Sequence, residues 1–526
     1  MPATWAHGAV ITDFSSVLFG HGTALHGAGG GDRGHEQPAC FTDLNLDQLV
    51  ASIVADFEEY DLAPLFWDRL TSEDAVAYRH EVFEDLEQPE LVETVQRFAE
   101  QMRAMRRQLA QARTLRNGYQ QAWWYLAATT TYRRAIEHLD GDLAGVELAS
   151  RGLCGLRHFV QGYRASPRFS TLAEHQDRLW AALGTVKYCL RIHGSRIEVR
   201  LYDGEADYSQ MVATTFEKFA QGEVTDRRVG FRSYPDLDHV EAAILDHVAQ
   251  LHAETFALLV RHPAEHQDFL DPTIARFDRE IQFYLAFRHW QRALERAGLT
   301  FCHPAVSVTS KAESVRGMFD AALAGKLAAS ARPVVANDYE LDGPERALVI
   351  SGPNQGGKTT FARAVGQIHF LAGLGVPVPA ASARLFLCDR VFTQFERQED
   401  MASHSGKLQD DLERMRGILE VATERSLVVM NELFASTTLH DARLLGRRIL
   451  EQILDRDMLC VCVTFIDELS RLRPSTVSMV SSVVPDDPTV RTFRILRRPA
   501  DGRAYALAIA ERYGLTYEHM KARLAS

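Results

Sequence analysis

The eight residues from Gly352 to Thr359 constrain this chain more than any other stretch, because they satisfy the pattern G-x-x-x-x-G-K-T. The apolar run ALVI before them has the character of a strand, and KTTFARAVGQIHFLAG at their end has helical periodicity. A strand, a glycine-rich loop and a helix in this order are the context in which the pattern binds phosphate. We therefore predict a phosphate-binding loop here, the alternative being a glycine-rich turn that only happens to carry a lysine.

Each residue type in this loop has a physical reason. Gly352, Gly356 and Gly357 leave room for backbone N–H groups to surround a phosphate, where side chains would obstruct them. The start of the following helix adds the positive end of its dipole. Lys358 is expected to neutralise β- and γ-phosphate oxygens, and Thr359 to bind Mg²⁺. ATP and Mg²⁺ are therefore the expected cofactors.

A second apolar run, Leu427 to Met430, is predicted to be a strand that delivers Asn431 and Glu432 to its carboxyl end, where ligands of α/β sheets bind. Glu432 is placed to orient or deprotonate an attacking water, and we assign it a catalytic role and a place in the Mg²⁺ site with Thr359. Asn431 keeps a carbonyl oxygen but lacks the charge of an aspartate. We therefore expect weaker Mg²⁺ binding or slower turnover, with nucleotide binding retained. The predicted nucleotide-binding residues are Gly352, Pro353, Asn354, Gln355, Gly356, Gly357, Lys358, Thr359, Thr360 and Asn431.

The amino-terminal part of the chain follows a different pattern. Residues 1–41 form a segment whose Gly/His-rich stretch, 20–39, is interpreted as a flexible loop or as a histidine metal site. Residues 42–300 are mostly helical in periodicity. The stretch VKYCLRIHGSRIEVRLYDG alternates in places and is rich in β-branched residues, which predicts a small β-hairpin inserted among helices.

Strands and helices alternate in residues 301–526 as far as about Val484, which is typical of an α/β domain, and the end of the chain predicts two helices joined at Gly514. The predicted fold class is therefore α + α/β. A mostly helical region comes first, and a P-loop α/β domain follows it.

Composition limits the classes of function. The net charge of −12 argues against a strongly basic nucleic-acid-binding protein but leaves a local basic groove open. Apolar runs are interrupted by charges or glycines, so no membrane span is expected, and the first residues lack the pattern of a secretion signal. The seven cysteines are scattered; Cys460 and Cys462, in an apolar strand, are interpreted as buried free thiols. We infer a cytoplasmic location.

These motifs resemble those of the MutS family of DNA mismatch-repair ATPases. GPNQGGKTT resembles that family's GPNMGGKST, and NELFASTTLHDA resembles its DEIGRGTSTYDG. The segments VAND, RVFTQF and AYALAIAERYGL also match in order. The resemblance is strong over residues 330–515 and weaker over 42–300, where the family has a helical lever core with an inserted clamp. It implies a helical lever with a small clamp-like insertion near 185–235, followed by a P-loop ATPase domain of the ABC type. It also implies a dimer that couples ATP turnover to clamping on DNA.

The chain departs from the family pattern at several positions. Val334 stands where the family has an aromatic residue against the base, and Phe465 where it has a histidine that senses the γ-phosphate. Asn431 replaces the aspartate of the second motif. Nothing before Phe41 is long enough for the family's mismatch-reading domain, so mismatch recognition is not expected to carry over.

The segment that reaches across the dimer in the family also differs. ASHSGKLQDDL, from Ala402, stands in place of the family's ASGRSTFMVEM. One hypothesis is that Lys407, at the start of a helix, contacts the γ-phosphate of the neighbouring subunit as a catalytic charge clamp. The other is that Lys407 is a solvated lysine on a capped surface helix.

Two kinds of partner remain open besides a second copy of the chain. DNA would be held through its backbone by two groups of basic residues. These are Arg103, Arg106, Arg107, Arg113 and Arg116 on a predicted helix, and Lys187, Arg191, Arg196 and Arg200 on the hairpin. For the first group we favour a solvated helix face next to a buried aromatic core. The alternative function is a nucleotide-dependent switch that acts on a protein partner and does not bind DNA.

Overall fold

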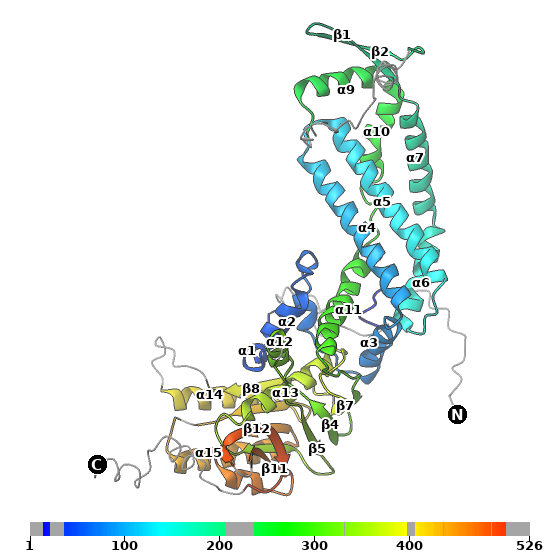
Figure 1. Cartoon of the computed structure of the whole chain (residues 1–526). Coiled ribbons are helices and arrows are strands. Elements are labelled where there is room, and N and C mark those ends of the chain that lie inside the picture. Colours follow the sequence, from blue (N-terminus) through cyan, green and yellow to red (C-terminus); the bar gives the residue numbers. More distant parts are fainter. Residues whose placement is uncertain are drawn as a thin grey trace, which may run out of the picture. The chain divides into compact units, whose positions relative to one another are not determined.

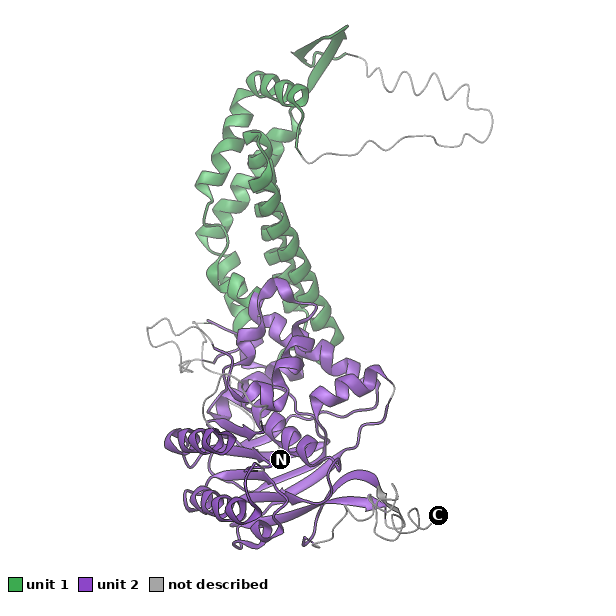
Figure 2. Ribbon diagram, turned by 90° about the vertical axis from the view of Figure 1, so that its left-hand side faces the viewer, with its two compact units in different colours: residues 1–14, 86–148, 154–278 green, residues 15–85, 149–153, 279–526 purple. Residues whose placement is uncertain are grey.

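The computed structural model describes residues 14–20, 36–205, 236–330, 332–396, 406–434, 436–484 and 487–500 (Figure 1). The chain forms two compact units, each assembled from separate stretches of sequence (Figure 2). Unit 1 comprises residues 1–14, 86–148 and 154–278, and unit 2 comprises residues 15–85, 149–153 and 279–526. The boundaries that the sequence predicts at residues 41 and 300 stay predictions. The two carboxyl-terminal helices predicted around Gly514 lie outside the described residues, as does the Gly/His-rich stretch at 21–35.

The described part of unit 1 is helical apart from one hairpin. Its elements are α4 (Pro89–Thr114), α5 (Gly118–Ala144), most of α6 (Arg151–Arg164), α7 (Pro167–Gly184), β1 (Tyr188–His193), β2 (Arg196–Leu201), α9 (His239–Leu251), α10 (Ala253–Glu265) and the start of α11 (Pro272–Arg296). Side chains cap several helices: Asn117 accepts from the N–H groups of Tyr119 and Gln120, and Asp238 forms a capping box with Glu241. The shared core of α5, α7, α9 and α10 contains Leu126, Leu179, Val248, Phe256 and Leu259.

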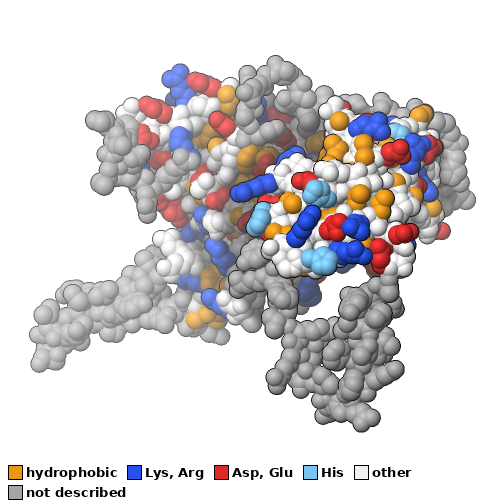
Figure 3. All heavy atoms as spheres, turned by 90° about the horizontal axis from the view of Figure 1, so that it is seen from above, with side chains coloured by type: hydrophobic (Ala, Val, Ile, Leu, Met, Phe, Trp, Pro, Cys, Tyr) orange, Lys and Arg blue, Asp and Glu red, His pale blue; other side chains and the backbone are white. Residues whose placement is uncertain are grey.

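The predicted hairpin is confirmed: β1 and β2 pair antiparallel around Gly194, which has a positive φ of 58°. Cross-strand partners point to the same face, so the register separates two faces. One carries the apolar pairs Tyr188–Leu201, Leu190–Val199 and Ile192–Ile197, and the other carries Cys189–Arg200, Arg191–Glu198 and His193–Arg196. Viewed from above, exposed hydrophobic side chains lie among basic and acidic ones (Figure 3). Ile192 and Leu201 of the hairpin are exposed.

Unit 2 contains two sheets and the helices around them. Its amino-terminal elements are α1 (Cys40–Leu44), α2 (Leu46–Val54), the 3₁₀ helices η1 (Glu58–Tyr60) and η2 (Ala63–Phe66), and α3 (Glu73–Asp85). The elements after α11 are β3 (Ala305–Ser307), β4 (Glu313–Met318), α12 (Ala321–Ala329), β5 (Asn337–Leu341), β6 (Ala347–Ser351), α13 (Lys358–Gly373), β7 (Ser382–Phe386), β8 (Val391–Phe395), α14 (Lys407–Val421), β9 (Leu427–Asn431), α15 (Leu439–Asp455), β10 (Leu459–Val463), η3 (Asp467–Arg471), β11 (Thr476–Val484) and β12 (Asp487–Arg497).

The larger sheet has the order β12-β11-β6-β10-β9-β8 and is parallel except for β12. All five residues of β6, β9 and β10 are buried, as expected for parallel strands covered on both faces. Ala347, Val349, Val428 and Met430 pack with α14 and α15, and α13 packs on the opposite face. The smaller sheet has the order β3-β7-β4-β5. The predicted combination of a mostly helical region with an α/β region is confirmed at this level.

Helix α13 is buried along almost its whole length and is tied down at its carboxyl end. The Arg79 guanidinium donates to the carbonyl oxygen of Leu374 at 2.7 Å, and the Arg69 guanidinium donates to that of His369 at 3.0 Å. Arg79 itself is buried, and its pKa is lowered by that burial. These contacts set basic side chains from the amino-terminal part of unit 2 against the negative end of the α13 dipole.

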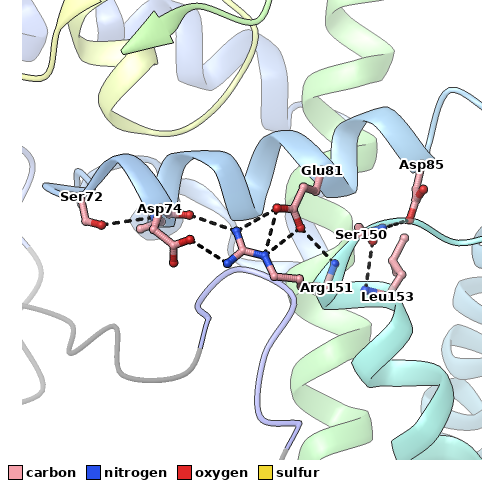
Figure 4. A network of polar contacts seen from close by, with 8 residues as sticks. Ser72, Asp74, Glu81, Asp85, Ser150, Arg151 and Leu153 are labelled. Carbon is pink, nitrogen blue, oxygen red and sulfur yellow. Dashed lines mark hydrogen bonds and ion pairs between the residues drawn. The ribbon is translucent and has the colours of Figure 1, made fainter. Parts of the chain in front are cut away.

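A polar network joins α3 to the start of α6 within unit 2 (Figure 4). Arg151 pairs with Asp74 at 2.7 Å and with Glu81 at 2.8 Å. The buried carboxylate of Asp85 accepts the N–H groups of Ala149 and Ser150, at 3.0 and 2.8 Å. These bonds fix the short 149–153 segment in unit 2, although the residues on both sides of it belong to unit 1.

All seven cysteines are free, and Cys460 and Cys462 are buried, as predicted. Burial raises the pKa of Cys462 to about 12, so its thiol stays protonated near neutral pH. Among the described residues, no helix combines the length and the apolar character that a membrane span needs.

Candidate nucleotide-binding site

The glycine-rich loop leaves the carboxyl end of β6 and enters α13. It turns through three left-handed positions, with φ of 113° at Gly352, 60° at Gln355 and 88° at Gly357. Glycine adopts such angles freely, whereas Gln355 is a non-glycine residue in this conformation. Gly357 is the N-cap of α13, so the first N–H groups of that helix face the loop.

Strand β11 supports the loop from the side. The hydroxyl of Ser481 donates to the carbonyl oxygen of Gly356 at 2.8 Å, and both groups are buried. A Cβ atom at Gly356 would lie 2.2 Å from Ser481 Oγ and 3.0 Å from the oxygen of Pro353. Residue 356 is therefore a glycine because of this close approach, and its φ is not the reason.

Lys358 places a buried ammonium inside the loop. Its Nζ donates to the carbonyl oxygens of Gly352 at 3.0 Å and Pro353 at 3.1 Å, and to Asn354 Oδ1 at 3.2 Å. Burial lowers the pKa of Lys358, while the Glu432 carboxylate acts to raise it. The three donors of the ammonium are held by neutral oxygens, so the positive charge inside the loop is not neutralised by these contacts.

Strand β9 brings Asn431 to the beginning of α13. Thr359 Oγ1 donates to Asn431 Oδ1 at 2.9 Å, and Asn431 is buried. Because the hydroxyl proton points at the amide oxygen, the lone pairs of Thr359 Oγ1 remain available to a cation. The amide oxygen can orient the threonine as a carboxylate would, but it adds no negative charge.

Glu432 follows in a left-handed conformation, with φ of 53°, and its N–H donates to the oxygen of Val463 at 2.9 Å. Phe434, buried two residues later, has φ of 60°. Two non-glycine residues in this region of φ within three positions are uncommon, and such strain concentrates at functional sites. The half-buried Glu432 side chain lines the same cavity as the loop.

The cavity beside the loop has a volume of about 630 Å³. Its polar wall is made by residues 354–360 and Glu432. Its apolar wall includes Leu323 and Leu327 of α12, Val334 and Phe493. The structure thus brings residues 354–360 of the loop and Glu432 together around one cavity. Gly352, Pro353 and Asn431 do not line it, but Gly352 and Pro353 bind the Lys358 ammonium and Asn431 binds Thr359.

Phe493 belongs to this site although no sequence motif indicates it. Its ring is 48% exposed and its φ is 57°. Asn337 fixes this conformation, because its Nδ2 donates to the oxygen of Phe493 at 3.1 Å and its Oδ1 accepts the N–H of Ile495 at 2.7 Å. A single aromatic residue on an edge strand gives no usable signal until the strand is placed beside the loop. No sequence motif indicates Arg491 either, although its Nε donates to the carbonyl oxygen of Asn354 in the loop at 3.3 Å.

Lys407 does not line this cavity. It is the first residue of α14, and its Nζ pairs with the carboxylate of Glu396 within the same chain. Phe465 is 51% exposed, and the neighbouring Thr464 donates its N–H to the oxygen of Ile350 at 3.0 Å. Lys407 and Phe465, two positions at which the chain departs from the family pattern, both lie in unit 2. The role of Lys407 in trans stays a prediction.

The Gly356→Ala substitution is expected to lower the free energy of unfolding by about 1–3 kcal/mol, because the added methyl group overlaps Ser481 Oγ. Urea unfolding measures this, with Gly417→Ala as control, since a Cβ at Gly417 meets nothing within 4 Å. The double variant Gly356→Ala/Ser481→Ala should recover part of the loss, because it removes the overlapping oxygen. Equal stability of the two single glycine variants would contradict the role given to Ser481.

Comparison with known proteins agrees with this geometry. Residues 348–522 match MutS domain V. Two proteins named DNA mismatch repair protein MutS, from the J-10-fl and Y-400-fl strains of Chloroflexus aurantiacus, are each 31% identical over 193 residues. The match covers 35% of this chain and 20% of each relative, so the chain corresponds to about a fifth of their length. This matched stretch, which contains the loop, β9 and β11, is a domain of the MutS family.

Proposed function

We propose that this chain binds and hydrolyses ATP with Mg²⁺ as a MutS-like ATPase. The observation that carries the proposal is the Lys358 ammonium held inside the glycine-rich loop by Gly352, Pro353 and Asn354, next to the Thr359–Asn431 hydrogen bond. A buried positive charge among neutral oxygens favours an anion, and the amino terminus of α13 points into the same space. A triphosphate satisfies both features.

The residues present suit the roles expected of them. Lys358 would exchange its carbonyl partners for β- and γ-phosphate oxygens, and Gly357 would present backbone N–H groups. Thr359 Oγ1 would hold Mg²⁺, with Asn431 orienting its hydroxyl. The ion would neutralise developing negative charge on the phosphate oxygens. Glu432 would position and deprotonate the attacking water.

The apolar wall of the cavity suits the base of the nucleotide. Val334 provides a small apolar surface but no ring. The exposed ring of Phe493 borders Gly357: a Cβ atom there would lie 3.6 Å from Phe493 Cδ1. Phe493 is therefore our candidate for the stacking surface that Val334 lacks.

We also propose that the chain acts as a dimer whose closure depends on ATP. Large apolar side chains are exposed at Leu439 and Leu444 of α15, which follows β9, and at Phe465, two residues after β10. Exposed apolar side chains often mark protein contacts, so these three are our candidates for the surface that meets the second copy. In that assembly Lys407 would leave Glu396 to meet the partner's phosphate.

We propose a cytoplasmic location, consistent with seven free cysteines.

The basic face of the hairpin is our candidate for DNA contact. Arg196 and Arg200 lie on one face with Arg191, where phosphate contacts would position DNA without selecting a sequence. On α4, by contrast, Arg106 pairs with the buried carboxylate of Asp278, which supports a structural role for that arginine. A switch that acts on a protein partner remains the alternative.

Replacing Lys358 with alanine should weaken ATP binding on the order of 100-fold, since charge-assisted hydrogen bonds to phosphate are lost. Isothermal titration with ATP and Mg²⁺ measures the affinity. Lys326→Ala, at an exposed lysine of α12 outside the cavity, is the matched control. Unchanged affinity in Lys358→Ala would remove the basis of the proposal.

Restoring the charge with Asn431→Asp should lower the Mg²⁺ concentration for half-maximal turnover about tenfold, because carboxylates bind Mg²⁺ more strongly than amides do. Phosphate release across a Mg²⁺ series provides the measurement, with Glu432→Ala as an inactive baseline. Identical Mg²⁺ profiles for wild type and Asn431→Asp would mean that Asn431 does not contribute to the metal site.

The double variant Arg196→Ala/Arg200→Ala should bind duplex or branched DNA more weakly, with a slope against log salt reduced by about 2. Filter binding with duplex, branched and single-stranded DNA, with and without ATP, measures this. The control is Arg134→Ala/Arg178→Ala, which removes two exposed arginines of the same unit. If wild type shows no salt-sensitive binding at low salt, the protein-partner alternative is favoured.

A further inference from the structure

Two histidines and a carboxylate meet on the surface of unit 1, far along the sequence from the nucleotide site. His175 belongs to α7, and Glu265 and His266 stand at the end of α10. His175 Nδ1 lies 3.0 Å from His266 Nε2 and 3.8 Å from a carboxylate oxygen of Glu265. One ligand atom from each residue lies within 4.8 Å of the other two.

The contact between the two rings places two potential ligand nitrogens side by side. One ring must be a hydrogen-bond donor and the other an acceptor at the 3.0 Å contact, so the pair holds one shared proton between two nitrogens. A divalent cation in place of that proton would use the lone pairs of both nitrogens at once, and the nearby carboxylate of Glu265 would offset its charge.

The supporting bonds hold the histidines independently of this contact. The carbonyl oxygen of His266 accepts hydrogen bonds from the Tyr125 hydroxyl at 2.8 Å and from the N–H of Phe269 at 3.1 Å. The backbone N–H of His266 donates to the carbonyl oxygen of His262 at 3.1 Å. On α7, the residues next to His175 in the helical repeat, Leu172 and Leu179, are buried in unit 1. The backbones that carry the ligand atoms are therefore fixed before any ion arrives.

The spacing fits a transition metal better than Ca²⁺ or Mg²⁺. With Zn–N and Zn–O bonds of about 2.0–2.2 Å, tetrahedral ligand atoms stand roughly 3.3–3.6 Å apart. The observed separations of 3.0 and 3.8 Å lie on either side of that range, within reach of small side-chain rotations. Two imidazoles also favour zinc, cobalt or nickel over the hard cations, which prefer oxygen. The His175 and Glu265 side chains are 35% and 49% exposed, so solvent can deliver the ion and complete its coordination.

We propose that His175, Glu265 and His266 form a binding site for a divalent transition metal, with Zn²⁺ as the best match. The ion joins α7 to α10. Three residues separate α7 from β1, and α9 and α10 follow the hairpin in the sequence. The bound ion therefore braces the two helical supports of the hairpin. The site does not depend on the proposed ATPase activity.

Metal titration of the full-length, untagged protein without nucleotide tests the site. Zn²⁺ is titrated against a chromophoric chelator, and Co²⁺ is titrated while its visible absorption is recorded. Wild type should bind one more equivalent of Zn²⁺ than His175→Ala or His266→Ala. Neither of these two variants should give the tetrahedral Co²⁺ absorption of wild type. His247→Ala, which removes an exposed histidine of α9, should behave as wild type. Equal stoichiometry in wild type and both cluster variants would overturn the proposal.

Two further variants keep the result interpretable. Glu265→Gln preserves the shape of the cluster and should lower Zn²⁺ affinity at least tenfold while circular dichroism stays unchanged. A variant with His21, His26 and His35 replaced by asparagine removes histidines of the Gly/His-rich stretch. The equivalent assigned to the cluster should survive in it, and loss of that equivalent there, with retention in His175→Ala, would refute the proposal.

Discussion

The parallel pairing of β6 with β10 and β11, and of β10 with β9, is the constraint on which the candidate site depends. Strands that run in the same direction end at the same edge, so the loop after β6, the Asn431–Glu432 pair after β9 and Thr464 after β10 converge there. These strands are completely buried, and helices that pack on both faces of the sheet hold them in place. The chemistry at the edge is thus positioned by packing several residues away from it.

Helix α13 also fixes the spacing of the elements around the site. Its Gln367 donates to Leu44 at 2.8 Å and to Asp320 at 2.9 Å, and accepts the N–H of Ala321 at 2.8 Å. Asp320 caps α12, the helix that provides the apolar wall of the cavity, and burial raises the pKa of its carboxyl. One buried amide therefore fixes the distance between the helix that presents the phosphate loop and the helix that faces the base.

The same helix is anchored to the smaller sheet by a buried carboxylate. Glu313 accepts hydrogen bonds from the hydroxyl of Tyr339 at 3.0 Å and the N–H of Phe386 at 3.1 Å, and it contacts His369 Nε2 at 2.8 Å. A buried charged group of this kind is stable only when its partners are all in place. The network therefore specifies how β4, β5, β7 and α13 fit together.

Features that depend on local sequence pattern could be predicted from the sequence, whereas features that depend on long-range packing could not. The loop, the strand before Asn431 and the hairpin were predictable because periodicity and turn residues act over a few positions. Ser481, Phe493 and the partner of Lys407 were not, because each becomes significant only when a distant strand or loop is placed beside it. The interruption of unit 1 by residues 149–153 has the same cause, since it depends on the carboxylate of Asp85 meeting two distant N–H groups.

The guanidinium groups at the far end of α13 have an electrical consequence. Arg79 and Arg69 compensate the negative pole of that helix inside the protein, where no counter-ion from solution is needed. At the positive pole, the Lys358 ammonium is held by neutral oxygens, and the Glu432 carboxylate offsets part of its charge. The helix therefore directs its positive end toward the cavity, while basic side chains stabilise its negative end inside the protein.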